Sequence, residues 1–120
     1  MTQVTVQDIK NNSGASIGSI IRWNDLTDND EGAWIEMLGS RGVVQVVRTL
    51  EGAEAPIGRF VIEGRNADDV EGMVLNSKRN TKMNFNNSAI EEFNEMPRYI
   101  RPRADGIKNG KFSVIIMITL

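Results

Sequence analysis

Residues 97–120 read PRYIRPRADGIKNGKFSVIIMITL, and this stretch decides the fold. The pair Asn109-Gly110 stands between Lys108 and Lys111. Asn-Gly is the strongest short-range signal for a two-residue β-hairpin, because both residues tolerate the positive φ angles of a type I′ turn. The sequence therefore predicts a hairpin in this stretch, with its turn at Asn109-Gly110.

The strand that follows this turn is apolar on nearly both faces. One face carries Phe112, Val114, Ile116, Ile118 and Leu120. The opposite face would alternate as polar if water covered it, but Ile115 and Met117 interrupt it. The strand is therefore predicted either to lie at the centre of a sheet that is covered on both sides, or to contribute Ile115 and Met117 to a subunit interface.

The rest of the chain is also rich in strand signals. Short runs with β-branched and aromatic residues alternate with turns that contain Gly, Asn, Asp or Pro. These runs are residues 4–6, 17–23, 33–38, 43–50, 59–64 and 73–75. The pattern predicts an all-β protein, an antiparallel β-sandwich of jelly-roll type with about eight strands.

One short helix is predicted from Ala89 to Asn94. Ser88 and Glu91 have the spacing of a capping box, in which each side chain bonds a free backbone amide of the first turn. Ile90 and Phe93 are three residues apart and would face the core together. Pro97 disfavours helical geometry at the residue before it and ends the helix.

The chain of 120 residues is expected to form one folded unit. Residues 1–16 are predicted to be an N-terminal arm or first strand, because residues 11–16 have loop composition. Residues 17–120 are predicted to form the β-sandwich domain.

Composition excludes several kinds of chemistry. The sequence has no cysteine and no histidine, so it lacks a thiol nucleophile, a zinc-thiolate site and the usual general base. Its net charge of -2 argues against a dedicated nucleic-acid binder. Residues 1–4 lack the basic start and apolar stretch that are typical of a secretory signal, so none is expected, and no apolar run reaches the length of a bilayer. We expect no catalytic residues, cofactor or metal, and no membrane partner.

Two stretches carry a resemblance to a known group of proteins. Residues 42–75 contain GVVQVV, GRFVIEGRNADD and MVL in this order, and residues 97–102 read PRYIRP before the strand at residues 112–120. This pattern resembles small virion structural proteins of tailed bacteriophages, in which a strand, a loop and an alternating strand precede a closing hairpin. Residues 65–69 depart from it, because the Ser and final Gly of the usual turn are absent.

The resemblance implies a capsid decoration (cement) protein. Such a protein would be a β-sandwich that assembles as an oligomer on the capsid surface, after synthesis in the host cytoplasm. Its partner would be the major capsid protein, and it would need no cofactor. Small proteins at the local threefold positions of a shell share that symmetry, so a homotrimer is expected. Its interface is predicted to use Ile115 and Met117 together with Val43 and Val47.

A second group of candidate interface residues lies before the hairpin. Arg98, Arg101 and Arg103 flank Tyr99, and arginine and tyrosine are enriched at the energetic centres of interfaces. The arginines are predicted to contact an acidic capsid surface. The alternative is an edge strand that its charges keep soluble, with Pro102 blocking a further ladder bond.

Two charged clusters remain, and solvated loops are the favoured interpretation of both. The first is a potential oxygen-ligand set for calcium, without the glycine spacing of an EF-hand: Asp25, Asp28, Asp30 and Glu31. The second has the charge to meet phosphates or an acidic partner: Lys78, Arg79 and Lys82.

Three classes of function follow, in decreasing order of support. The first is a structural protein that decorates and stabilises a phage head. The second is a carbohydrate- or receptor-binding module of a tail or fibre, for which the available aromatic residues are Trp23, Trp34 and Tyr99. The third is an enzyme with paired carboxylates, for which Glu36 and Glu63 are the candidates.

Overall fold

A computed structural model describes residues 3–120, and in these residues every regular element is a β-strand. The nine strands are β1 (Gln3–Lys10), β2 (Ser16–Asp28), β3 (Ile35–Glu36), β4 (Arg41–Leu50), β5 (Ile57–Arg65), β6 (Met73–Val74), β7 (Asn84–Phe85), β8 (Ala89–Glu92) and β9 (Tyr99–Thr119). The predicted all-β class is confirmed. No helix among the described residues is long and apolar enough to span a membrane.

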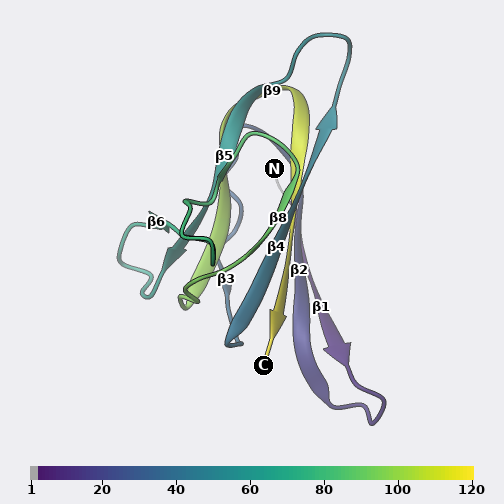
Figure 1. Cartoon of the computed structure of the whole chain (residues 1–120), viewed down its shortest axis with the longest axis vertical. Coiled ribbons are helices and arrows are strands. Elements are labelled where there is room, and N and C mark those ends of the chain that lie inside the picture. Colours follow the sequence, from purple (N-terminus) through teal and green to yellow (C-terminus); the bar gives the residue numbers. More distant parts are fainter. Residues whose placement is uncertain (1–2) are drawn as a thin grey trace.

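Strand β9 lies at the centre of the sheet, and every strand pairing is antiparallel. Its C-terminal half lies between β2 and β4, which gives the order β1-β2-β9-β4-β8. Its N-terminal half pairs with β5 and β3 instead, and β5 also pairs with β6 and β7. Figure 1 shows β9 bending into an arch below the loop that joins β4 to β5, with β5 beside one limb and β2 and β4 beside the other.

The predicted hairpin at Asn109-Gly110 is wrong, because β9 passes through this point as one bent strand. Asn109 does adopt a positive φ of 59°, but the two limbs of β9 pair with different neighbours. Gly110 serves another purpose. A Cβ at Gly110 would lie 2.6 Å from the carbonyl oxygen of Thr49, so glycine lets β4 approach β9 closely. The pairing of β9 with β4 and with β5 therefore overrides the local preference for a turn at Asn109-Gly110.

The predicted helix from Ala89 to Asn94 is also wrong, because residues 89–92 form β8 against β4. The two residues of the expected capping box have other partners. The Ser88 hydroxyl accepts a hydrogen bond from the backbone N–H of Arg48, at 2.9 Å, and Glu91 forms an ion pair with Arg79. Ile90 is exposed and Phe93 is buried, as expected for strand positions on opposite faces.

The core lies between the two limbs of β9, where the sheet folds back on itself. The Phe60 ring from β5 packs against the Phe112 ring from β9, with 4.4 Å between the ring centroids. Fully buried side chains from both halves surround this contact: Trp23, Leu26, Val44, Val46, Ile62, Ile100, Val114 and Ile116. The predicted jelly-roll sandwich of two separate sheets is therefore wrong, because the strands form one open antiparallel sheet whose two halves share β9.

The remaining strand predictions differ mainly in length. Residues 43–50 and 59–64 lie in β4 and β5, which extend beyond these limits. The strand predicted at residues 33–38 shrinks to β3, which pairs only with Tyr99 and Ile100. The indole N–H of Trp23 donates a hydrogen bond to the carbonyl oxygen of Ala33, so this carbonyl serves a side chain and not a ladder.

The bend of β9 depends on a close approach between two glycines. Gly58 in β5 has a φ of 91°, and a Cβ there would lie 2.4 Å from the carbonyl oxygen of Gly106 in β9. We expect Gly58→Ala to lower the free energy of unfolding by about 2–4 kcal/mol, because the backbone strain adds to a steric clash. Urea denaturation measures the loss.

The matched control is Gly14→Ala in the turn between β1 and β2. Gly14 has a similar φ of 85°, but nothing lies within 4 Å of an added Cβ. Its expected loss is about 1 kcal/mol, from the left-handed backbone alone. Equal losses for the two variants would show that the contact between β5 and the bend contributes nothing.

Candidate functional site

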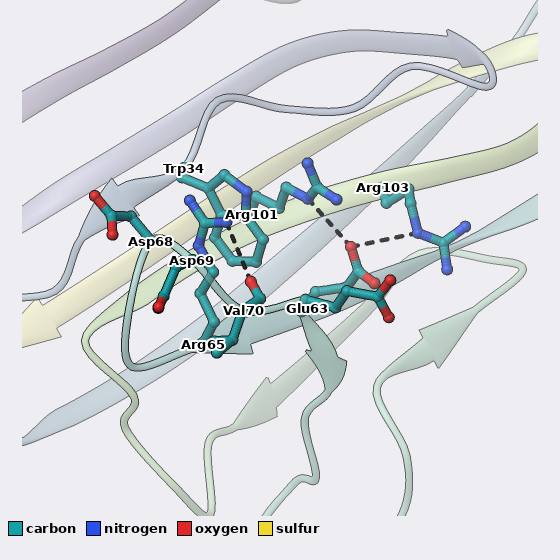
Figure 2. Close-up of a pocket in the computed structure, with 10 residues that line it drawn as sticks. Trp34, Glu63, Arg65, Asp68, Asp69, Val70, Arg101 and Arg103 are labelled. Atoms are coloured by element: carbon teal, nitrogen blue, oxygen red, sulfur yellow. Dashed lines mark hydrogen bonds and ion pairs between the residues drawn. The ribbon is translucent and has the colours of Figure 1, made fainter.

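A polar pocket lies on the N-terminal half of β9, and we call it the Trp34 pocket. It has a volume of about 570 Å³ and opens to solvent. Two neighbouring strands supply its central charges: Glu63 of β5 pairs in register with Arg101 of β9. Figure 2 shows the labelled residues of this pocket: Trp34, Glu63, Arg65, Asp68, Asp69, Val70, Arg101 and Arg103.

Glu63 is the charge at the centre of the Trp34 pocket. Its side chain is only 9% exposed and lies between two arginines of β9. The Nε atoms of Arg101 and Arg103 lie 3.1 Å and 3.3 Å from the Glu63 Oε1 atom, as Figure 2 shows. Arg101 also reaches Glu31, at 3.1 Å. Opposite charges that face each other across strands stabilise a sheet, so this network ties β5 to β9.

The Trp34 ring is already in contact with two cations. The guanidinium carbons of Arg65 and Arg101 lie 4.2 Å and 4.5 Å from its ring centroid, which is the distance of a cation–π interaction. Trp23 is fully buried in the core. Trp23 is therefore not accessible for stacking on a sugar, and Trp34 already contacts two guanidinium groups of its own chain. The carbohydrate-binding alternative stays a prediction.

Arg98 and Tyr99 lie beside the pocket. The Arg98 Nε donates a hydrogen bond to Glu36, at 2.9 Å, and its guanidinium carbon lies 5.1 Å from the Tyr99 ring centroid. The hydrogen bond to Glu36 is the largest cause that raises the pKa of Arg98 above its ordinary value. All three predicted capsid-contacting arginines thus hold a carboxylate of their own chain. Their role as partner contacts stays a prediction.

The other two predicted interface residues lie on a separate surface. Ile115 and Met117 point away from the core on the C-terminal half of β9, whereas Val114 and Ile116 are fully buried. Met117 pairs in register with Ile20 of β2 and with Val43 of β4. We call this surface the outer face and define it by Ile20, Val43, Gln45, Ile90, Ile115 and Met117, which line a shallow groove.

The outer face is apolar and lacks a cover within residues 3–120. Met117 is 42% exposed and Ile90 is 65% exposed. Val47, which was also predicted for the interface, pairs with Ser113 further along the same ladder. This strand was predicted either to be covered on both faces or to contribute Ile115 and Met117 to an interface. Within residues 3–120, only the face with Val114 and Ile116 is covered.

The charged loops have simple partners. Asp28 pairs with Lys108 at 3.1 Å, and Asp25 lies 3.6 Å from Lys111. Asp30 accepts a hydrogen bond from the backbone N–H of Thr27. Among the described residues, no three acidic side chains gather as a metal site would require. In the basic cluster, Arg79 pairs with Glu91, while Lys78 and Lys82 are exposed.

Sequence reasoning found the outer face but not the Trp34 pocket. Two apolar residues on the expected polar side of a strand were enough to single out Ile115 and Met117. The pocket needs the register between β5 and β9, which sets Glu63 opposite Arg101. The only signal in the sequence is the spacing of charges on two strands whose pairing is unknown in advance.

Comparisons with known proteins show a shared fold and no family. No protein-family model matches the chain, and no curated protein matches it. The solved structure of the SPBc2 prophage-derived protein YomS superposes with a TM-score of 0.59 at 10% sequence identity, over 99% of this chain and 96% of that chain. Peruvianin-I, a cysteine peptidase from Thevetia peruviana latex, gives a TM-score of 0.45 at 6% identity, over 97% of this chain and 61% of its own. The second similarity is too low to indicate a shared fold.

The Glu63 network is expected to stabilise the fold. Replacing Glu63 by Gln removes the carboxylate from two partly covered guanidinium groups, so we expect Glu63→Gln to lose about 2–3 kcal/mol of unfolding free energy. Urea denaturation again measures the change. Glu36→Gln is the control, because the ion pair between Glu36 and Arg98 is exposed and its removal should leave the midpoint unchanged. Equal changes would contradict the assignment of Glu63 as the stabilising charge.

Proposed function

We propose that this protein is a non-enzymatic structural component of a phage particle, and that it decorates the capsid as a cement protein. The observation that carries the proposal is the uncovered apolar outer face. A fold shared along nearly the whole chain with a prophage-derived protein supports it.

The outer face is suited to packing against protein. Soluble monomers rarely expose a large contiguous apolar patch, and such patches usually mark interaction sites. Here the patch lies on a rigid ladder of β2, β9 and β4, not on a loop. We propose that the protein is a homo-oligomer that uses this face, with three copies as the expected number at a threefold position of a shell.

The physical basis of cementing is linkage. A protein that binds the assembled shell and not its separated subunits stabilises the shell by its free energy of binding. An oligomer that contacts several capsid subunits at once adds avidity, because each further contact forms within one complex. The major capsid protein is therefore the proposed partner, and the outer surface of the head the proposed location.

Two other surfaces remain available to the capsid in this arrangement. Arg98 and Arg103 keep exposed guanidinium groups beside the Trp34 pocket. Among residues 3–120, strand β1 pairs with β2 only, so one side of its backbone could add a strand from a partner. This strand belongs to the predicted arm of residues 1–16, whose first two residues lie outside the described residues.

The test is to strip the protein from virions and heat bare and redecorated particles. We expect redecorated particles to release DNA at a higher temperature, because bound copies must dissociate before the shell opens. Dye binding to released DNA measures the transition. Release at the same temperature with and without the protein would refute the cementing role.

Two methionine variants test the contribution of the outer face. Met117→Glu places a charge in the middle of this face, and we expect a monomer that no longer protects the particles. Met73→Glu is the matched control, since Met73 is 76% exposed on β6, in the other half of the sheet. Light scattering gives the mass of each variant. A Met117→Glu variant with the mass of the unmodified protein would contradict the proposed interface.

A further inference from the structure

We infer that the rotation axis of the oligomer runs parallel to the C-terminal half of β9, above Ile115 and Met117. Ile20 of each copy then packs on Val43 of the next copy. The occupant of the outer face is thus a second copy of this chain. This inference rests on the self-association in the proposed function, but not on binding to a capsid.

The residues of the outer face form two rows across the strands. In the first row, Met117 of β9 stands between Ile20 of β2 and Val43 of β4. In the second row, Ile115 stands between Arg22 and Gln45. The face is therefore apolar along β9, and one apolar residue lies on each side of Met117.

A rotation about β9 brings the β2 side of one copy against the β4 side of its neighbour. This sets Ile20 against Val43, so an apolar side chain meets an apolar one. An axis at right angles to the strands and between the two rows would instead set Ile20 against Arg22 and Val43 against Gln45. Burying those polar groups against apolar ones is costly, which argues against that axis.

The charges at the border of the face are complementary in the same arrangement. Arg22 is exposed and forms no ion pair with the described residues, although it lies in the centre of a ladder. On the β4 side of the outer face, Glu92 of β8 pairs in register with Val43. The Glu92 carboxylate lies 3.7 Å from the guanidinium group of Arg41. Rotation about β9 brings Arg22 of one copy to the side on which its neighbour carries Glu92, where opposite charges fix the register.

Strands of packed sheets lie nearly aligned and their facing side chains interdigitate. Rotation about an axis parallel to β9 keeps the strands aligned, so a closed ring of two or three copies brings Ile20 toward Val43 of the next copy. In either ring, Met117 lies near the axis and contacts Met117 of the neighbouring copy. The contact between Ile20 and Val43 is between different residues of neighbouring copies. These two properties can be measured separately.

Disulfide cross-linking tests the axis, because the chain has no cysteine of its own. Within one copy, Ile20 and Val43 lie two strands apart, about 9–10 Å, and their side chains point the same way on the outer face, so a disulfide cannot join them. Between copies the two side chains point toward each other. The double variant Ile20→Cys and Val43→Cys should therefore cross-link only between copies. We expect mild oxidation to give a ladder of covalent species that ends at the number of copies in the ring.

The single variants decide the direction of the axis. Ile20→Cys alone and Val43→Cys alone should stay uncross-linked, whereas an equal mixture of the two should give covalent dimers. Met117→Cys should cross-link by itself. Met73→Cys, which lies off the outer face, is the negative control. Cross-linking of Ile20→Cys alone as strongly as the double variant would overturn the axis along β9.

Two further outcomes overturn the inference. The first is a double variant that stays monomeric after oxidation at about 100 µM protein. The second is a double variant that links only to a capsid protein when oxidised on particles. The cementing role is measured separately, by DNA release from particles that carry the reduced variants. If the expected covalent oligomers form but the particles are not protected, the inferred axis stands and the cementing role is refuted.

Discussion

The ladders of β9 are the constraint on which the rest of this structure depends. Its C-terminal half supplies the bonds that join β2 to β4, and its N-terminal half carries β5 and β3. The bend between the halves turns one sheet into two layers and brings Phe60 onto Phe112. Because the same strand forms both layers, a change at the bend alters the distance between them. The close approach of Gly58 to Gly106 is for this reason a structural requirement of the core, and not a detail of a loop.

The two halves of β9 present different chemistry to their surroundings. On the N-terminal half, Arg101 and Arg103 are held by Glu63, so the charges that β9 brings to the Trp34 pocket are paired within the chain. On the C-terminal half, Ile115 and Met117 face outward without a cover from the described residues. One half thus tolerates water and the other favours protein. The proposed role in an assembly requires both, since one surface has to stay soluble while another associates.

Local patterns predicted the strands better than their connections. Runs of β-branched and aromatic residues identified β4 and β5, and an apolar run identified the C-terminal half of β9. The hairpin at Asn109-Gly110 and the helix from Ala89 failed for a common reason. Both rest on signals within four residues, whereas the observed partners are distant in sequence: Leu50 for Gly110, and Val46 for Ala89. The outer face was predictable because its signal lies within one strand. The Trp34 pocket was not predictable, because its residues can be brought together only when the register of β5 against β9 is known.

The place of β9 in the sequence has a consequence for how the chain acquires its structure. The central strand follows all the others, and its partners Ile20 and Val43 are 97 and 74 residues away from Met117. Contacts of such separation make folding slow, typically milliseconds to seconds, because loop closure must precede the gain from pairing. During synthesis β2 and β4 emerge from the ribosome without the strand that joins them. Their unpaired edges must wait for β9, and in that interval they are open to wrong partners on neighbouring chains.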